Sequence, residues 1–460
     1  MKQREKFKSR LGFLLLSAGC AIGIGNVWRF PYVVGANGGG AFVLFYLLFL
    51  VIMGVPVLSM EFAVGRASRK SPVKAYQELE KPGQKWHLHG YVALFGNYML
   101  MMFYTTVAGW MLYYFYSFFT GRFTGETAEG VQAAFDEMLA SPGVNVFWMV
   151  LVVVLGIFIC SMGLQKGVER ITKMMMIGLL SLMIILAVRG VTLEGGMDGL
   201  KFYLLPDFGK MAEVGIGKVV VAAMNQSFFT LSLGIGAMAI FGSYLEKEHT
   251  LLGEAVNVAV LDTFVAIVAG LIIFPACFAF GVSPDSGPSL IFITLPNVFT
   301  HMIGGRLWGT LFFLFMSFAA LSTVIAVFEN IIACGMELWQ IDRKKAAWMN
   351  VALIILLSLP CALGYNVLGA VHPLGAGTAI LDLEDFIVSN LLLPLGSLVY
   401  LVFCTWRYGW GFDKYQAEAN AGVGLKVPNW CRVYMAYILP LMIIGVFWQG
   451  IWGYLVKLFA

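Results

Sequence analysis

The chain has 460 residues, of which 60% are hydrophobic and 12% are charged. Soluble domains carry about 25% charged residues, so this composition excludes a soluble protein and predicts an integral membrane protein with the lipid bilayer as a partner. The net charge of +4 gives no indication of a nucleic-acid partner, and we expect none. Seven cysteines without paired spacing, and no CxxC or HExxH motif, exclude a disulfide framework and a zinc site of these types.

Apolar runs close to the ~20 residues that cross a bilayer recur along the whole chain. They predict an all-α integral membrane protein that forms a single transmembrane domain over residues 1–457. An odd number of spans places the two termini on opposite sides of the membrane. The eleven predicted spans are 11–37, 40–65, 90–120, 145–163, 169–189, 216–244, 254–281, 306–338, 347–364, 382–406 and 433–457.

The distribution of Lys and Arg predicts the orientation. With the N-terminus inside, the cytoplasmic segments hold 22 of the 30 basic residues, as the positive-inside rule requires. We therefore expect a multi-pass protein of the cell inner (plasma) membrane with a cytoplasmic N-terminus and an external C-terminus. The opening residues also resemble a lipoprotein signal sequence that ends at Cys20, but the apolar run continues past that cysteine.

The first predicted span contains an unusual stretch, GCAIGIGNVWRFP, at residues 19–31. Glycine costs about 1 kcal/mol in a helix interior, so glycines spaced this closely let the chain leave helical geometry. Backbone groups released inside a membrane are tolerated only when they are buried in protein or line a polar cavity. There, carbonyls can coordinate a cation and helix N-termini can bind an anion. The alternative is close helix packing through the GxxxG pair Gly19 and Gly23.

A second glycine stretch, FTLSLGIGAM at residues 229–238, lies in the sixth predicted span. Ile22–Gly25 and Leu233–Gly236 align, and the second copy lies five spans after the first, an odd shift, so the copies enter the bilayer from opposite sides. This predicts an inverted 5+5 repeat, with repeat one at about 11–189, repeat two at about 216–406 and an extra span at about 433–457. Matching interrupted spans in two such halves indicate a binding site at the midplane.

Over essentially its whole length the chain resembles bacterial neurotransmitter:sodium symporters. The motifs are RLGFLLLSAGCAIGIGNVWRFPYVVGANGGGAF, FFTLSLGIG, LSTVIA and Asp385. The resemblance implies the LeuT-type fold, with spans 1 and 6 discontinuous. It also implies a secondary active transporter, not an enzyme, that couples sodium to the uptake of a neutral hydrophobic amino acid by alternating access. The alternatives are a sodium-coupled carrier of amines or other small solutes, and an amino-acid sensor that does not transport.

The resemblance implies two sodium sites built from oxygen ligands. The first comprises the substrate carboxylate with Ala21, Asn26, Thr230 and Asp262. The second comprises Gly19, Ile22, Ala319, Ser322 and Thr323. The alternative for the two hydroxyls is a bond to their own helix, and the alternative for Asp262 is a helix-end position. An ionisable residue within a span is by default a functional candidate. The fixed charge of Asp262 would balance sodium without an anion, so we expect chloride independence.

Gly23 stands where monoamine carriers of the family have Asp, so we expect it to leave space and the ligand to bring its own carboxylate. The hydroxyl of Tyr104 and the N–H groups of Ile24 and Gly25 would bind that carboxylate. The residues implied for the amino group are Ala21, Phe229, Thr230 and Ser232. Those implied for the apolar side chain are Leu100, Phe229, Ile235, Thr323 and Val327, each of which could instead be ordinary packing.

Two gates are also implied. Arg29 would pair with Asp385 on the external side and close over Tyr104 and Phe229. On the cytoplasmic side Arg4 would pair with Glu337, and Tyr244 would brace that pair.

Two residues depart from the family pattern. Cys20 replaces a polar residue found beside the substrate in some relatives, and Ile177 stands where many relatives have a proline ten residues after Gly167.

Overall fold

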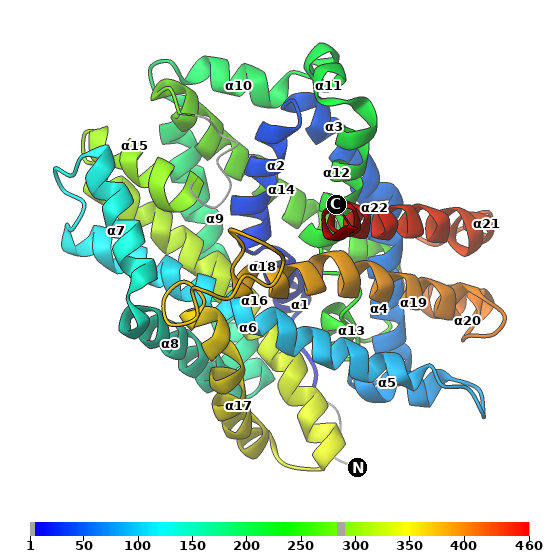
Figure 1. Cartoon of the computed structure of the whole chain (residues 1–460). Coiled ribbons are helices and arrows are strands. Elements are labelled where there is room, and N and C mark those ends of the chain that lie inside the picture. The colour runs from blue at the N-terminus through cyan, green and yellow to red at the C-terminus, as the bar shows by residue number, and fades with distance from the viewer. Residues whose placement is uncertain (1–4, 283–289, 460) are drawn as a thin grey trace.

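The computed structural model describes residues 5–282 and 290–459, and its regular elements there are helices (Figure 1). The first group comprises α1 (Arg10–Ala21), α2 (Phe30–Ala36), α3 (Gly40–Phe49), α4 (Val55–Ser68), α5 (Pro72–Leu79), α6 (His87–Thr120), α7 (Ala128–Ala140), α8 (Pro142–Ser161) and α9 (Arg170–Val191). The second group comprises α10 (Gly196–Leu204), α11 (Phe208–Val214), α12 (Ile216–Thr230), α13 (Ala237–Gly242), α14 (Leu251–Ala279), α15 (Leu295–His301) and α16 (Gly305–Trp339). The third group comprises α17 (Arg343–Leu363), α18 (Ile380–Phe386), α19 (Leu393–Thr405), α20 (Phe412–Ala419), α21 (Cys431–Val433) and α22 (Leu439–Phe459).

Short π-helical turns precede or join several of these helices. They are η1 (Gly25–Arg29), η2 (Leu50–Gly54), η3 (Leu164–Glu169), η4 (Leu290–Thr294), η5 (Ile387–Leu392) and η6 (Tyr434–Ile438). Such turns carry one extra residue per turn and are frequent at functional sites. Two of them lie where the sequence predicts function: η1 follows the first glycine stretch, and η5 follows the gate residue Asp385.

Within the described ranges, nine helical segments are long and apolar enough to cross a membrane, or ten when the bent pair that begins with α1 counts as one span. The sequence predicts eleven. The difference lies at the predicted sixth span, 216–244, which consists of α12 with 15 residues and α13 with 6. Each of these is too short to cross the ~30 Å core alone.

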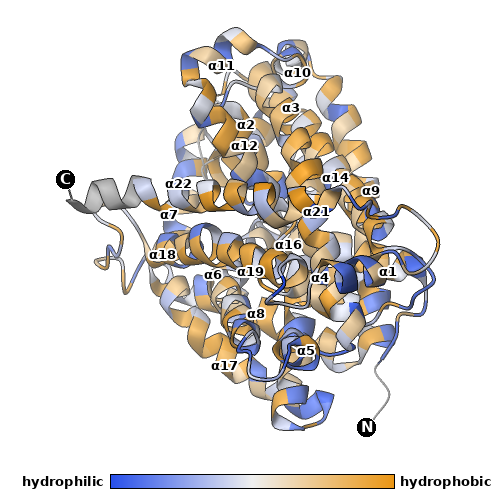
Figure 2. Ribbon diagram, turned by 90° about the vertical axis from the view of Figure 1, so that its right-hand side faces the viewer, coloured by the Kyte–Doolittle hydropathy of each residue, from blue (hydrophilic) through white to orange (hydrophobic). Residues whose placement is uncertain are grey.

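The helices at the centre of the protein are more buried than those at its rim. In α16, 78% of the most apolar window is buried inside the protein, whereas the figure is 39% for α8, α9 and α17. α16 therefore packs against other helices on most sides, while the other three present apolar faces outward (Figure 2). An apolar outer face is what a bilayer requires of a spanning helix. α1 and α6 pack directly against α16 and share its central position (Figure 1).

The chain breaks at both glycine stretches. α1 ends at Ala21, and the pair formed by α1 and the η1–α2 segment bends by 55°. α12 ends at Thr230 and α13 begins at Ala237, with positive φ at Gly234 (98°) and Gly236 (72°) between them. Glycine adopts such angles at little cost, and Ser232, between α12 and the two glycines, also has a positive φ of 50°. The second break therefore depends on Gly234 and Gly236, which the sequence places there.

One backbone amide released by the second break is met by a buried carboxylate. Gly234 N–H donates to Glu61 Oε1 of α4, which is fully buried. Asn97 of α6 donates its amide to the carbonyl of Ile235, at 2.7 Å. Because an unpaired backbone group in an apolar interior costs several kcal/mol, these two side chains stabilise the non-helical segment.

Close packing of α4 on α13 allows a test of this architecture. A Cβ at Gly65 would collide with the carbonyl oxygen of Ala239 and lie 2.9 Å from the amide of Ser243. We expect Gly65→Ala to lower the midpoint of thermal unfolding in detergent, at a cost of about 1–3 kcal/mol. The matched control is Gly445→Ala in α22, where a Cβ meets nothing within 4 Å. Equal midpoints for the two variants would contradict the close α4–α13 contact.

Candidate functional site

A buried polar cluster joins the two breaks to α14. The Asn26 amide donates to Asp262 Oδ1 at 2.8 Å and to Thr230 Oγ1 at 3.2 Å. The Thr230 hydroxyl donates to Asp262 Oδ2 at 2.8 Å. All three side chains are at most 1% exposed. Three of the four protein residues predicted for the first sodium site therefore lie together, although they belong to η1, α12 and α14; the fourth, Ala21, ends α1.

The charge of this cluster is uncompensated. In the described part of the chain, Asp262 forms no ion pair with a basic side chain. A buried carboxylate without a cationic partner is costly. Asp262 and Thr230 supply carboxylate and hydroxyl oxygens, the ligands that hard cations prefer, while the Asn26 amide oxygen accepts the Gly23 N–H of the first break at 3.3 Å. The residues present therefore fit a small cation such as sodium, bound beside Asp262.

A second group of oxygens lies where α1 ends beside α16. The Thr323 hydroxyl is 3.2 Å from the Gly19 carbonyl and 3.4 Å from the Ile22 carbonyl. The Ser322 hydroxyl is 2.9 Å from the Ala319 carbonyl of its own helix and 3.5 Å from that of Ile22. Carbonyls at a helix C-terminus have no partner within the helix, which leaves them available to ligands. The five residues predicted for the second sodium site are thus neighbours.

A small cavity of about 30 Å³ lies between the two breaks. It is lined by Cys20, Ala21, Gly23, Gly25, Leu100, Tyr104, Phe229, Ser232, Ile235, Thr323, Val388 and Leu393. Most of the residues predicted to bind substrate are in this set. The exceptions are Ile24, Thr230 and Val327. Of these, Ile24 still contributes its backbone N–H, which donates to the Tyr104 hydroxyl at 3.0 Å.

Sequence reasoning missed Val388 and Leu393, which come from η5 and the start of α19. Val388 lies three residues after Asp385, so the two share one helical face. The three-residue spacing from Asp385 could therefore have predicted that Val388 lies near the site. No such spacing was available for Leu393, because its position depends on how α19 packs beyond the π-helical turn.

Gly23 does not leave open space in this conformation, contrary to the sequence-based expectation. A Cβ there would collide with the Tyr104 hydroxyl and lie 2.7 Å from the Thr323 hydroxyl. A Cβ at Gly25 would lie 2.6 Å from the Phe229 ring. Both glycines instead permit side chains to approach the backbone of the first break, which explains the small cavity.

The external gate differs from the predicted direct pair. Arg29 lies over the Phe229 ring, 4.0 Å from its centroid, and donates to the Ser389 hydroxyl at 3.4 Å. Ser389 in turn donates to Asp385 Oδ1 at 2.7 Å. Ser389 lies one helical turn after Asp385, so its hydroxyl occupies the position between the two charged groups. The predicted gate residues are therefore connected through a serine.

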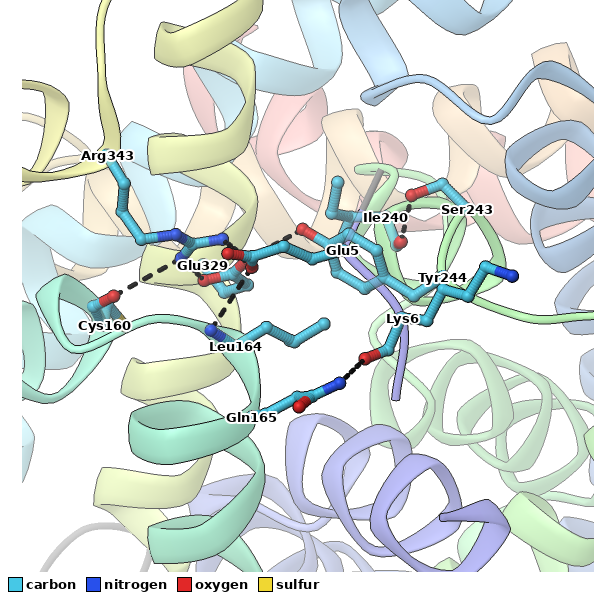
Figure 3. Close-up of polar contacts among 10 residues, drawn as sticks. All are labelled: Glu5, Lys6, Cys160, Leu164, Gln165, Ile240, Ser243, Tyr244, Glu329 and Arg343. Atoms are coloured by element: carbon cyan, nitrogen blue, oxygen red, sulfur yellow. Dashed lines mark hydrogen bonds and ion pairs between the residues drawn. The ribbon is translucent and has the colours of Figure 1, made fainter. Parts of the chain in front are cut away.

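The opposite face is closed by a second set of charges (Figure 3). Arg343 binds both carboxylate oxygens of Glu329, at 2.6 and 3.0 Å, and also binds Glu5 at 2.7 Å. The Tyr244 hydroxyl donates to Glu329 Oε1 at 2.7 Å. Glu329 is fully buried, and Arg343 is largely buried. Sequence reasoning missed both residues of this central pair, although an acid within a predicted span was a usable signal.

Tyr244 thus contacts Glu329, whereas the sequence predicts it beside Glu337. Glu337 lies eight residues further along α16, and its carboxylate accepts hydrogen bonds from Ser71 N–H at 2.9 Å and Ser71 Oγ at 2.7 Å. Eight residues span about 12 Å of helix, so one tyrosine reaches only one of the two acids. Arg4, the predicted partner of Glu337, lies outside the described residues.

Comparison with known proteins identifies the family. The profile of the sodium:neurotransmitter symporter family matches residues 4–137 and 129–458. The chain belongs to this family. It is therefore a multi-pass membrane transporter of a sodium-dependent family and not an enzyme, as the sequence predicts.

Two curated bacterial relatives cover nearly the whole chain. The uncharacterized sodium-dependent transporter YhdH of Bacillus subtilis is 35% identical over 96% of this chain and 96% of its own length. An uncharacterized sodium-dependent transporter of Haemophilus influenzae is 33% identical over 97% and 98%. The crystal structure of MhsT in complex with L-phenylalanine superposes with a TM-score of 0.87 at 38% identity, covering 97% of this chain and all of MhsT. The predicted LeuT-type helical fold is confirmed by this match.

The buried pair of Glu329 and Arg343 allows a stability test. We expect Arg343→Ala to destabilise the protein by about 3–5 kcal/mol, because it leaves the Glu329 carboxylate buried without a cation. The double variant Glu329→Gln/Arg343→Met should recover most of that loss. Thermal unfolding in detergent measures both effects.

The control is Arg432→Ala, which breaks the exposed pair with Asp413 and should leave the midpoint of unfolding unchanged. A double variant as unstable as Arg343→Ala would show that the loss does not come from the uncompensated charge.

Proposed function

We propose that the protein is a symporter that couples sodium to the uptake of a neutral hydrophobic amino acid, without chloride. The observation that carries this proposal is the buried cluster of Asn26, Thr230 and Asp262 between the two helix breaks. We further propose that it works in the cell inner (plasma) membrane, with its N-terminus in the cytoplasm and its C-terminus outside.

Two features support sodium coupling at two sites. The first site supplies one fixed negative charge, from Asp262, and a substrate carboxylate beside it would complete the oxygen set. The second site, at Ser322 and Thr323, offers hydroxyl and carbonyl oxygens only. Sodium at the first site would neutralise Asp262, so no anion is needed, which supports chloride independence.

The cavity supports a neutral, apolar amino acid as substrate. Its walls include Leu100, Ile235, Val388 and Leu393, and among the described residues no charged side chain lines it. The Tyr104 hydroxyl beside the Ile24 N–H gives one polar end, suited to a carboxylate. The related MhsT has been solved with L-phenylalanine, which agrees with this substrate class. An amine without a carboxylate would offer the Tyr104 O–H no acceptor.

The closed gates support alternating access. In this conformation Arg29 covers Phe229 on one side of the cavity, and Glu329 with Arg343 closes the other side. We infer that each gate opens in turn and that the two breaks are the hinges of an inverted repeat. Two sodium ions entering at 100 mV with a tenfold gradient supply about 7 kcal/mol, against about 1.4 kcal/mol per tenfold accumulation of substrate. The coupling is energetically sufficient.

Uptake into proteoliposomes tests the function. We expect a panel of labelled leucine, phenylalanine, tryptophan and tyrosine to include a substrate that accumulates under an inward sodium gradient, with or without chloride. Replacement of sodium by potassium should abolish accumulation. Sodium-dependent binding without accumulation would favour a sensor, and accumulation of amines in place of amino acids would favour the amine carrier.

Asp262→Asn tests the charge argument. Removing the carboxylate leaves a sodium ion without a counter-charge, so uptake in chloride-free buffer should fall by about tenfold or more. Added chloride should restore part of it. Asp413→Asn, in the exposed ion pair between α20 and α21, is the matched control. Full chloride-free uptake by Asp262→Asn would refute the assignment.

A further inference from the structure

The residues that precede α1 are held by the π-helical turn η3. Gln165 donates its side-chain amide to the Lys6 carbonyl at 2.8 Å, and Leu164 N–H donates to the Glu5 carboxylate at 3.3 Å (Figure 3). η3 begins directly after Gly163, whose φ is 97°. Two elements about 160 residues apart in sequence are therefore joined by contacts on the same face as the Glu329–Arg343 gate.

The strongest contact comes from the last residue of η3, Glu169. Its carboxylate accepts hydrogen bonds from Lys8 N–H at 2.8 Å, Ser9 N–H at 3.2 Å and the Ser9 hydroxyl at 3.3 Å. The Ser9 hydroxyl is also 3.0 Å from the amide of Gly12 in the first turn of α1. Glu169 and Ser9 together satisfy amides at and before the N-terminus of α1, which have no helical partner.

The charge of Glu169 is balanced in an unusual way. The residue is 5% exposed, and in the described part of the chain it forms no ion pair with a basic side chain. The balancing groups are the N–H dipoles at the start of α1, where the helix carries a partial positive charge. The carboxylate therefore loses its partners if α1 moves away, and it must then be hydrated.

α9 and the residue before it, Glu169, pack closely against α1 near both ends of α1. A Cβ at Gly12 would collide with the Glu169 carboxylate, so only glycine allows this approach. At the far end of α1, a Cβ at Gly19 would lie 3.2 Å from Met176 and 3.3 Å from Thr172. The Gly19 carbonyl belongs to the second oxygen group. A change at η3 is thus positioned to reach that group through α1.

We propose that Glu169 is a positioning residue that latches the N-terminal end of α1 to α9 and so holds the cytoplasmic side closed. The Glu169 contacts by themselves support the latch between α1 and α9, and its role in transport rests on the function proposed above.

Hydrogen exchange on the purified full-length protein, followed by mass spectrometry, tests the latch. In Glu169→Gln the side-chain NH₂ must face one of two N–H donors, so at least one charge-assisted hydrogen bond is lost. Because such bonds contribute about 1.5–3 kcal/mol, exchange of the amides of residues 10–16 should accelerate about tenfold or more. Exchange in α12 and α18 should not change, because the expected opening is local.

Two further variants keep the test independent of one substitution. Gly12→Ala places a methyl group where the carboxylate lies and should accelerate exchange in the same residues. Gln165→Ala removes the exposed Gln165–Lys6 bond and should give a smaller, local effect. The control is Glu248→Gln, an exposed acid in the loop after α13, which should exchange as the unaltered protein does. Unchanged exchange of residues 10–16 in Glu169→Gln and Gly12→Ala, or faster exchange throughout the chain, would overturn the latch.

Repeating the exchange in sodium and in potassium separates the latch from the proposed function. Sodium should slow exchange of residues 10–16 in Glu169→Gln towards the rate of the unaltered protein, because an ion at the second site favours the closed state. If Glu169→Gln accelerates local exchange but sodium has no effect, the latch stands and the sodium site fails. If sodium protects α1 but Glu169→Gln changes nothing, the sodium site stands and the latch fails.

Discussion

Breaking a helix inside an apolar protein interior releases backbone groups that must find partners, and this constraint organises the centre of the molecule. At the first break, the hydroxyls of Ser322 and Thr323 take up carbonyls at the end of α1, and Tyr104 accepts the Ile24 N–H. At the second break, Glu61 accepts the Gly234 N–H. The groups that satisfy the breaks are also those that lie around the cavity and the two oxygen clusters. The site is therefore a consequence of how the breaks are stabilised.

The buried acidic side chains of this interior differ in the groups that balance their charge. Glu329 is matched by Arg343, and Glu169 by the amides of the α1 N-terminus. Asp262 and Glu61 are both fully buried without a basic partner in the described residues. Glu61 accepts the Gly234 N–H, whereas Asp262 lies beside the Asn26 amide and the Thr230 hydroxyl. A buried carboxylate without a cation is costly, and a cation at the proposed site would offset that cost for Asp262.

Closure on both sides of the cavity depends on contacts between elements distant in sequence. On one side, Arg29 of the first break reaches Phe229 and Ser389. On the other, the segment before α1 meets α9 and the Arg343 end of α17 through Glu169 and Glu5. The first closure comes from η1, beyond the break, and the second from the residues beside the N-terminus of α1. A shift of α1 relative to α9 would therefore weaken the second closure without moving Arg29 directly, which is the separation that the proposed alternating access requires.

The sequence by itself determined the membrane class, the helical fold, the positions of both breaks and the residues around the two oxygen clusters. It could do so because apolar run length and paired glycines act locally, and because the motifs are those of the family. Only the tertiary structure decided that Ser389 links Arg29 to Asp385, that Tyr244 contacts Glu329, and that Tyr104 closes on Gly23. Helical periodicity shows which residues share a face. It does not show which helix that face meets. Nor does it show which of two acids on the same helix, such as Glu329 and Glu337, a side chain from another helix contacts. Both depend on packing between elements far apart in the chain.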